Sequence, residues 1–138
     1  MKTPIIVDSS GLISLISADD MNHKIAMRIS EELGGLTALL IVSSDVFSET
    51  LNVIGKKFGH DLAVKVGQEL SKSESYTIIE TDEALRDSAL VLFHTQAHSV
   101  SFTDCVVMAC ADKFNSKDIF GFDKVFKKNG YMRLGFDK

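Results

Sequence analysis

The sequence predicts a three-layer α/β/α sandwich, in which helices cover both faces of a mostly parallel sheet of about five strands. Short apolar runs rich in β-branched residues alternate along the chain with segments of helical periodicity. The runs are apolar throughout, as expected of strands that are buried on both faces. The 138 residues, 45% of them hydrophobic, suffice for one well-packed core, so we expect a single domain over residues 1–138 and neither a disordered nor a fibrous chain.

The first half of the chain predicts two strands and four helices. The strands are expected at 5–7 and 39–42, and each is followed by residues that can cap a helix. The helices are expected at 12–16, from Asn22 to the Gly34–Gly35 pair, from Ser44 to Phe58 and at 60–72. Asp8 therefore ends the first strand, and Glu49 lies one turn into the third helix.

The second half continues the alternation of strands and helices. The pattern predicts a strand at 76–79, a helix at 84–95, a buried helix at 101–114, a strand at 119–122, a basic helical turn at 124–128 and an edge strand at 132–134. Asp123 closes the strand at 119–122, and Gly130 ends the basic turn.

The helix at 101–114 has almost no polar face, which is typical of a buried helix. Its first turn nevertheless carries Asp104. An ionised carboxylate at the start of a buried helix is costly unless the helix N-terminus, a base or a metal ion compensates its charge. Asp104 is therefore the first candidate for a functional residue.

Four acidic residues occupy comparable positions at strand ends and helix starts: Asp8, Glu49, Asp104 and Asp123. In an open α/β sheet such positions meet at the crevice outside the carboxyl ends of the strands. Their repulsion would raise their pKa values unless a cation lay among them, and carboxylates alone favour the hard ions Mg²⁺ or Mn²⁺. Such a site favours phosphodiester hydrolysis, although each acid taken singly could be a cap, a turn residue or a solvated charge.

Charge and cysteine content restrict the class of protein further. The net charge of −4 argues against nucleic-acid binding by bulk charge, but residues 113–138 carry seven basic and three acidic side chains. Cys105 and Cys110 point in different directions on one helix and indicate buried thiols in a reducing compartment. No apolar run is long enough to cross a membrane, so we expect a cytoplasmic protein.

Four stretches of the chain resemble PIN domains, and most of all the VapC-type toxins of bacterial and archaeal toxin–antitoxin pairs. They are IIVDSSGLISL, SSDVFSETLNVI, HSVSFTDCVVMACADKF and IFGFDKVFKKNGY, in this order. The resemblance implies that Asp8, Glu49, Asp104 and Asp123 form an acidic quartet that binds one or two Mg²⁺ or Mn²⁺ ions and cleaves single-stranded RNA. It also implies a homodimer and inhibition by a cognate antitoxin segment laid across the site.

We hypothesise a role for each of the four acids. We expect Asp8, Asp104 and Asp123 to hold the metal, and Glu49 to be a further ligand or to orient the attacking water. The implied products carry a 5′-phosphate and a 3′-hydroxyl.

One position departs from the family pattern. Many relatives carry Thr or Ser two residues before the last acid, where this chain has Gly121. Either Ser10, Ser101 or Thr103 supplies the missing hydroxyl, or metal binding is weakened.

Lysines near the acids are candidates to hold the RNA backbone, or they form a solvated basic face: Lys56, Lys57, Lys124, Lys127 and Lys128. Two other functions stay open. The chain could be a catalytically weak or inactive PIN-like module that binds RNA or a protein, or a nuclease outside the toxin setting, acting on DNA or in housekeeping RNA processing.

Overall fold

The computed structural model describes residues 2–35 and 38–138. Five strands form one sheet in the order β3-β2-β1-β4-β5, and all four neighbouring pairs are parallel. The strands are β1 (Thr3–Val7), β2 (Ala38–Ser43), β3 (Tyr76–Ile79), β4 (Asp118–Phe120) and β5 (Met132–Arg133). The predicted fold class is confirmed.

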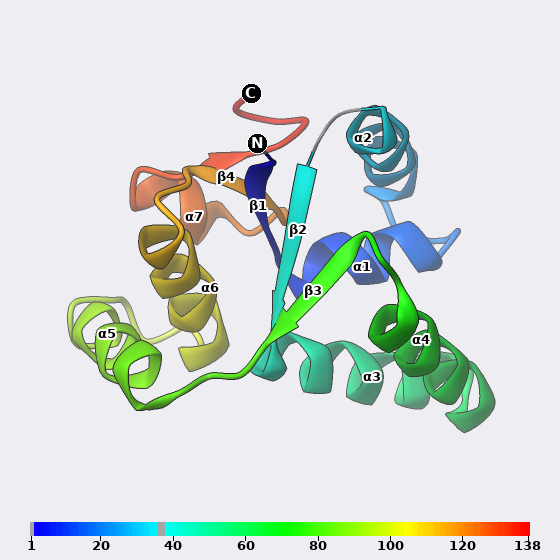
Figure 1. Cartoon of the computed structure of the whole chain (residues 1–138), viewed down its shortest axis with the longest axis horizontal. Coiled ribbons are helices and arrows are strands. Elements are labelled where there is room, and N and C mark those ends of the chain that lie inside the picture. Colours follow the sequence, from blue (N-terminus) through cyan, green and yellow to red (C-terminus); the bar gives the residue numbers. More distant parts are fainter. Residues whose placement is uncertain (1, 36–37) are drawn as a thin grey trace.

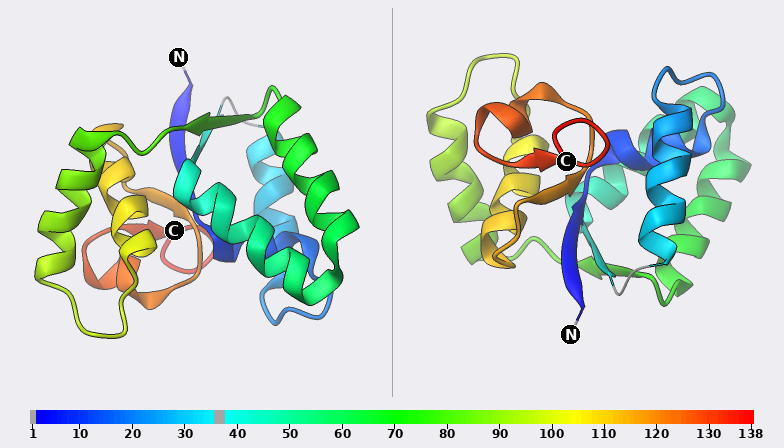
Figure 2. Two further views of the ribbon diagram at one scale, coloured as in Figure 1. Left: turned by 90° about the horizontal axis from the view of Figure 1, so that it is seen from below. Right: turned by 90° about the horizontal axis from the view of Figure 1, so that it is seen from above.

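Helices cover both faces of this sheet, which makes the three layers. Figure 1 shows α5 (Glu83–His94), α6 (Phe102–Lys113) and α7 (Lys124–Lys128) on one side of the strands. The other side carries α1 (Ser9–Ile16), α2 (His23–Gly34), α3 (Ser44–Phe58) and α4 (His60–Lys72). The same division is visible from below and from above in Figure 2.

The helix starts follow the capping residues of the sequence. The side chains of Ser43, Asp82 and Ser101 each accept a hydrogen bond from a backbone N–H in the first turn of the helix that follows. The predicted bounds of the segments at 60–72, 76–79 and 124–128 are those of α4, β3 and α7.

The strand predicted at 119–122 is wrong at its carboxyl end, because β4 stops at Phe120. The N–H of Phe122 does not continue the sheet and instead donates to the Oγ of Ser10, 3.0 Å away. Asp123 therefore lies beyond the strand, where it caps α7.

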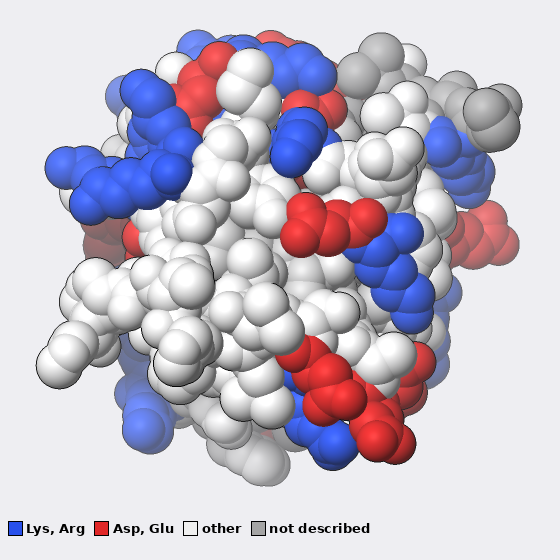
Figure 3. Space-filling view, turned by 90° about the vertical axis from the view of Figure 1, so that its left-hand side faces the viewer, with Lys and Arg blue, Asp and Glu red and all other residues white. Residues whose placement is uncertain are grey.

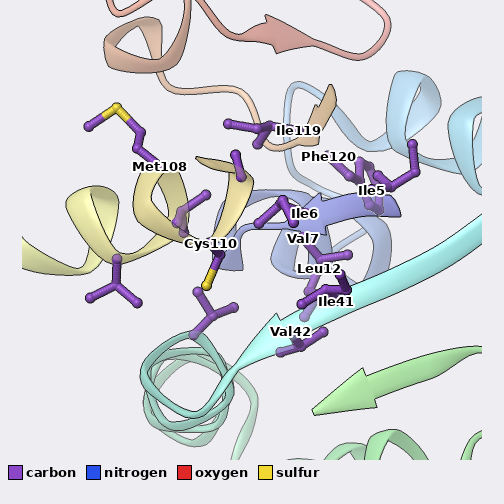
Figure 4. Close-up of a cluster of buried hydrophobic side chains, with 14 of the residues drawn as sticks. Ile5, Ile6, Val7, Leu12, Ile41, Val42, Met108, Cys110, Ile119 and Phe120 are labelled. Atoms are coloured by element: carbon purple, nitrogen blue, oxygen red, sulfur yellow. The ribbon is translucent and has the colours of Figure 1, made fainter. Parts of the chain in front are cut away.

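The core lies where α6 packs against the central strands (Figure 4). Every residue of α6 from Cys105 to Ala111 is buried, as its apolar surface predicted. Both cysteines are free thiols. Within the described ranges, no helix is long and apolar enough to cross a membrane.

The direction of the strand order changes at β1, which pairs with β2 on one side and β4 on the other. Ligands of open α/β sheets bind outside the carboxyl ends of the strands at such a point. Val7 pairs with Phe120 there, and the N–H of Asp8 donates to the carbonyl oxygen of Phe120 at 3.0 Å. The chain thus places Asp8 at the topological switch point.

Candidate active site at the carboxyl ends of the strands

Asp8 is a buried acid whose side chain is held by the first turn of α1. Its Oδ2 accepts hydrogen bonds from the backbone N–H of Ser10 at 3.2 Å and from the hydroxyl of Ser10 at 2.6 Å. Burial raises the pKa of Asp8 to about 6, and the charges of Asp104 and Glu49 add to the increase, while the bonds from Ser10 oppose it. The fold thus keeps a carboxyl group where its ionisation is unfavourable.

Asp104 is half-buried and forms a capping box with Ser101 at the start of α6. Its N–H donates to the hydroxyl of Ser101 at 3.1 Å, and its Oδ2 accepts from the N–H of Ser101 at 3.3 Å. Its pKa is raised by burial, then by the charge of Asp123 and, more weakly, by that of Glu49. Since Asp8 also senses its charge, Asp104 is electrostatically linked to each of the other three acids.

Glu49 and Asp123 approach this centre from two further elements. The Oε2 of Glu49, on α3, accepts a hydrogen bond of 2.7 Å from the hydroxyl of Ser9. Asp123 is exposed, and its Oδ1 accepts from the N–H of Val125 at 2.9 Å as the cap of α7. Asp8 and Asp123 are therefore helix caps, and Asp104 completes a capping box. The charges of Asp104 and Glu49 act on Asp8, and those of Asp123 and Glu49 act on Asp104.

The donor set fits a hard divalent ion, because all four side chains offer carboxylate oxygens. A cation among them would also relieve the repulsion that raises the pKa values of Asp8 and Asp104. In the part of the chain that the structure describes, no three acidic, histidine or cysteine side chains are close enough together to hold an ion. The carboxylates of the four acids instead accept hydrogen bonds from backbone N–H groups and serine hydroxyls, so ion binding requires these side chains to rotate. The metal ligands remain predictions.

The hydroxyl of Ser10 lies between the end of β1 and the segment that follows β4. It donates to Asp8 and accepts from the N–H of Phe122, thereby linking the end of β1 to the segment after β4. A Cβ atom at Gly121 would lie only 2.6 Å from the Cβ of Asp8, so the backbone passes too close for a side chain. Of the three candidate hydroxyls, Ser10 is therefore the one that contacts both strand ends.

The other two candidate hydroxyls lie at the start of α6. Ser101 contacts Asp104 through the capping box. Thr103 lines an open cleft of about 480 Å³ beside α3. We call this cleft, lined by Ser48, Glu49, Asn52, Lys56 and Thr103 among others, the Glu49 cleft.

A second cleft, of about 460 Å³, lies beside Asp104 and Asp123. We call it the Asp104–Asp123 cleft; its other lining residues include Gln96, Lys124, Lys128 and Asn129. The start of α6 contributes to both clefts, Thr103 to the first and Asp104 to the second.

The five candidate lysines divide into two groups. Lys56 lines the Glu49 cleft, and Lys124 and Lys128 line the Asp104–Asp123 cleft. Lys57 instead donates to the hydroxyl of Ser17 at 3.2 Å, and Lys127 lies 3.8 Å from the carboxylate of Asp137. The structure thus puts three of these lysines beside the acids and engages the other two elsewhere.

Three residues at the site were not singled out from the sequence. Ser9 precedes Ser10 in the turn after Asp8, and its contact with Glu49 spans 40 positions. Gln96 and Asn129 bond to each other across 33 positions. Only the adjacency of Ser9 to Asp8 could have indicated one of them, since no local pattern connects such distant positions.

Comparison with known proteins gives one family match and one structural likeness. A sequence model of the PIN domain matches residues 5–130. The chain matches none of the curated protein sequences with which it was compared. Among solved structures, it is similar to VapC20 of Mycobacterium tuberculosis, a toxin that cleaves the sarcin–ricin loop, with a TM-score of 0.84 and 22% sequence identity. The alignment covers 94% of this chain and 98% of the other, which establishes a shared fold.

Proposed function

Because the chain belongs to the PIN-domain family, we propose that it is a Mg²⁺- or Mn²⁺-dependent endoribonuclease that hydrolyses single-stranded RNA. The observation that carries this proposal is the electrostatic linkage of Asp104 to Asp8, Glu49 and Asp123. A fold that gathers these acids at a switch point, and raises the pKa values of Asp8 and Asp104, sacrifices stability for a site. Simple caps would need no such gathering, because each could be satisfied apart from the others.

The proposed mechanism assigns one task to each group of side chains. Asp8, Asp104 and Asp123 would hold the metal, and Glu49, oriented by Ser9, would be a further ligand or would orient the attacking water. When bound, the ion supplies activation of water and stabilisation of the leaving oxygen. Ser10 fixes the carboxylate of Asp8. Lys56, Lys124 and Lys128 contact the phosphates of the RNA from the two clefts.

We propose further that the chain is the toxin of a toxin–antitoxin pair and acts in the cytoplasm, where its RNA substrate is found. The support is the fold shared with VapC20 over nearly the full length of both chains. A cognate antitoxin segment would inhibit it by lying across the clefts. A short gene for a DNA-binding protein directly upstream would support this setting, and its absence would favour a housekeeping role.

We also propose a homodimer. The apolar side chains of Leu90, Val91 and Phe93 are exposed on α5. Figure 3 shows this side of the molecule, where a broad surface carries no Lys, Arg, Asp or Glu. Such a patch favours a protein partner, and a second copy of the chain is the simplest one.

The decisive experiment compares the wild type with Asp104→Asn on single-stranded RNA. We expect cleavage with Mg²⁺ or Mn²⁺, none with EDTA, and a decrease of about 100-fold in the variant, because one ligand loses its charge. An asparagine oxygen still accepts a capping bond, so the variant should fold. Asp82→Asn is the matched control, since Asp82 caps α5 and is not one of the four acids.

Three results would contradict the proposal. If neither the wild type nor the variant cleaves RNA, with or without the metal ion, while both still bind it, the chain is a binding module that does not cleave. Preferential cleavage of DNA in competition would favour a deoxyribonuclease. Undiminished cleavage by Asp104→Asn would remove the acidic quartet from the mechanism.

A further inference from the structure

The Asp104–Asp123 cleft contains two amide side chains that the proposed hydrolysis does not use. Gln96 lies in the loop between α5 and α6, and Asn129 follows α7. The Nε2 of Gln96 donates to the Oδ1 of Asn129 at 3.1 Å, and the Nδ2 of Asn129 donates back to the Oε1 of Gln96 at 3.1 Å. The two amides are therefore hydrogen-bonded to each other in the lining of the cleft.

These amides differ in how firmly they are held. The Nδ2 of Asn129 also donates to the carbonyl oxygen of Val125 at 2.9 Å, which ties it to its own helix. The second hydrogen-bond partner of the Gln96 side chain is the hydroxyl of the neighbouring Thr95, at a long 3.4 Å. An amide carries two donor hydrogens and two acceptor lone pairs, so both oxygens retain acceptor capacity. Gln96 is the amide that can turn toward a ligand at the lower cost.

The cleft also holds two lysines whose charge is available. Lys124 and Lys128 are four residues apart on α7 and share one face of it. Among the described residues, neither has a carboxylate within 4.0 Å, whereas Lys127 has Asp137. The lining thus carries the two ammonium groups together with the carboxylates of Asp104 and Asp123. The ammonium groups are the donors in this cleft that bind a phosphate.

We propose that the Asp104–Asp123 cleft is a nucleotide subsite that reads one base next to the scissile phosphate of single-stranded RNA. This inference rests on the proposed function and adds sequence preference to it. Lys124 and Lys128 hold the phosphate of that nucleotide, while Gln96 exchanges its two bonds with Asn129 for bonds to the base edge. A volume of about 460 Å³ is in the range of small-molecule sites. Because an amide pairs in a bidentate way with N6 and N7 of adenine, we expect adenine to be preferred.

The first test measures binding without cleavage, so it does not depend on the nuclease proposal. AMP, adenosine and ribose 5-phosphate are titrated separately into the ¹⁵N-labelled full chain in EDTA. We expect AMP to shift the side-chain amide signals of Gln96 and Asn129, and Lys128→Ala to weaken AMP binding about tenfold. Lys127→Ala is the matched control. Absent amide shifts, or equal weakening by both lysine variants, would overturn the subsite.

The second test measures the base preference of cleavage. A single-stranded RNA pool, randomised over its central positions, is cleaved and the products are sequenced. We expect one position beside the cut to favour adenine, and Gln96→Ala to reduce that preference about tenfold. Gln68→Ala, on the exposed surface of α4, is the control. An unchanged preference in Gln96→Ala would overturn the subsite, whereas AMP binding without any RNA cleavage would overturn only the proposed nuclease.

Discussion

Asp8 shows how the site acts on the stability of the fold. Its pKa is raised to about 6 from 3.8, mainly by burial, so the folded chain binds a proton more tightly than the unfolded chain. Between these two values the folded state carries more protons, and the stability falls as the pH rises. The full loss, present above pH 6, is about 3 kcal/mol at 1.36 kcal/mol for each pKa unit.

This loss predicts the behaviour of Asp8→Asn in the metal-free protein. At pH 7 we expect the variant to be more stable than the wild type by up to about 3 kcal/mol, because the buried charge is gone. The difference should shrink as the pH falls toward 4. Urea unfolding in EDTA at several pH values measures it, with Asp82→Asn as the control. A variant that is less stable than the wild type at pH 7 would contradict the burial of an unfavourable charge.

Gly121 predicts a second stability effect at the scale of a residue. Restoring the family hydroxyl with Gly121→Ser should destabilise the chain by roughly 1–3 kcal/mol, because the new Cβ would meet the Cβ of Asp8 at 2.6 Å. Urea unfolding again gives the free energy. Gly34→Ser is the control, since nothing lies within 4 Å of a Cβ at that position. Equal stability of the two variants would show that the segment after β4 can move away from Asp8.

At the scale of elements, the sequence predicted those helix and strand bounds that depend on interactions between residues close together in the chain. The apolar surface of α6 and its cap Ser101 lie within one stretch of sequence, so the buried helix and the position of Asp104 could be predicted. The end of β4 could not, because it depends on the contact of Phe122 with Ser10, 112 positions away. Propensity and periodicity do not include such contacts.

The lysines of α7 show the same limit within a single turn. Their spacing predicts that Lys124 and Lys128 share a face of the helix, but it does not show which of the basic residues forms an ion pair with an acidic side chain. Lys127 faces Asp137, whose carboxylate also accepts from the guanidinium of Arg133 at 2.9 and 3.1 Å. Those bonds hold the pKa of Asp137 down at about 2. Asp137 in the C-terminal turn therefore pairs with Lys127 and leaves Lys124 and Lys128 available to bind a ligand.

At the scale of the whole molecule, α5 connects the exposed apolar surface to the candidate site. Val91 is 72% exposed and Leu90 is 49% exposed on this helix. The loop that follows α5 contributes Gln96 to the Asp104–Asp123 cleft. Association of two copies through α5 would therefore restrict the motion of this loop. The dimer would contain two Asp104–Asp123 clefts.

The dimer predicts a specific response to charge on α5. Val91→Glu would bury an unpaired carboxylate at the interface, so we expect the dimer to dissociate at least about tenfold more readily than the wild type. Sedimentation equilibrium over a range of concentrations measures the dissociation constant. Met21→Glu is the matched control, because Met21, between α1 and α2, is at 93% the most exposed large apolar side chain among the residues that the structure describes. A monomeric wild type, or equal dissociation of both variants, would show that the α5 surface does not hold two copies together.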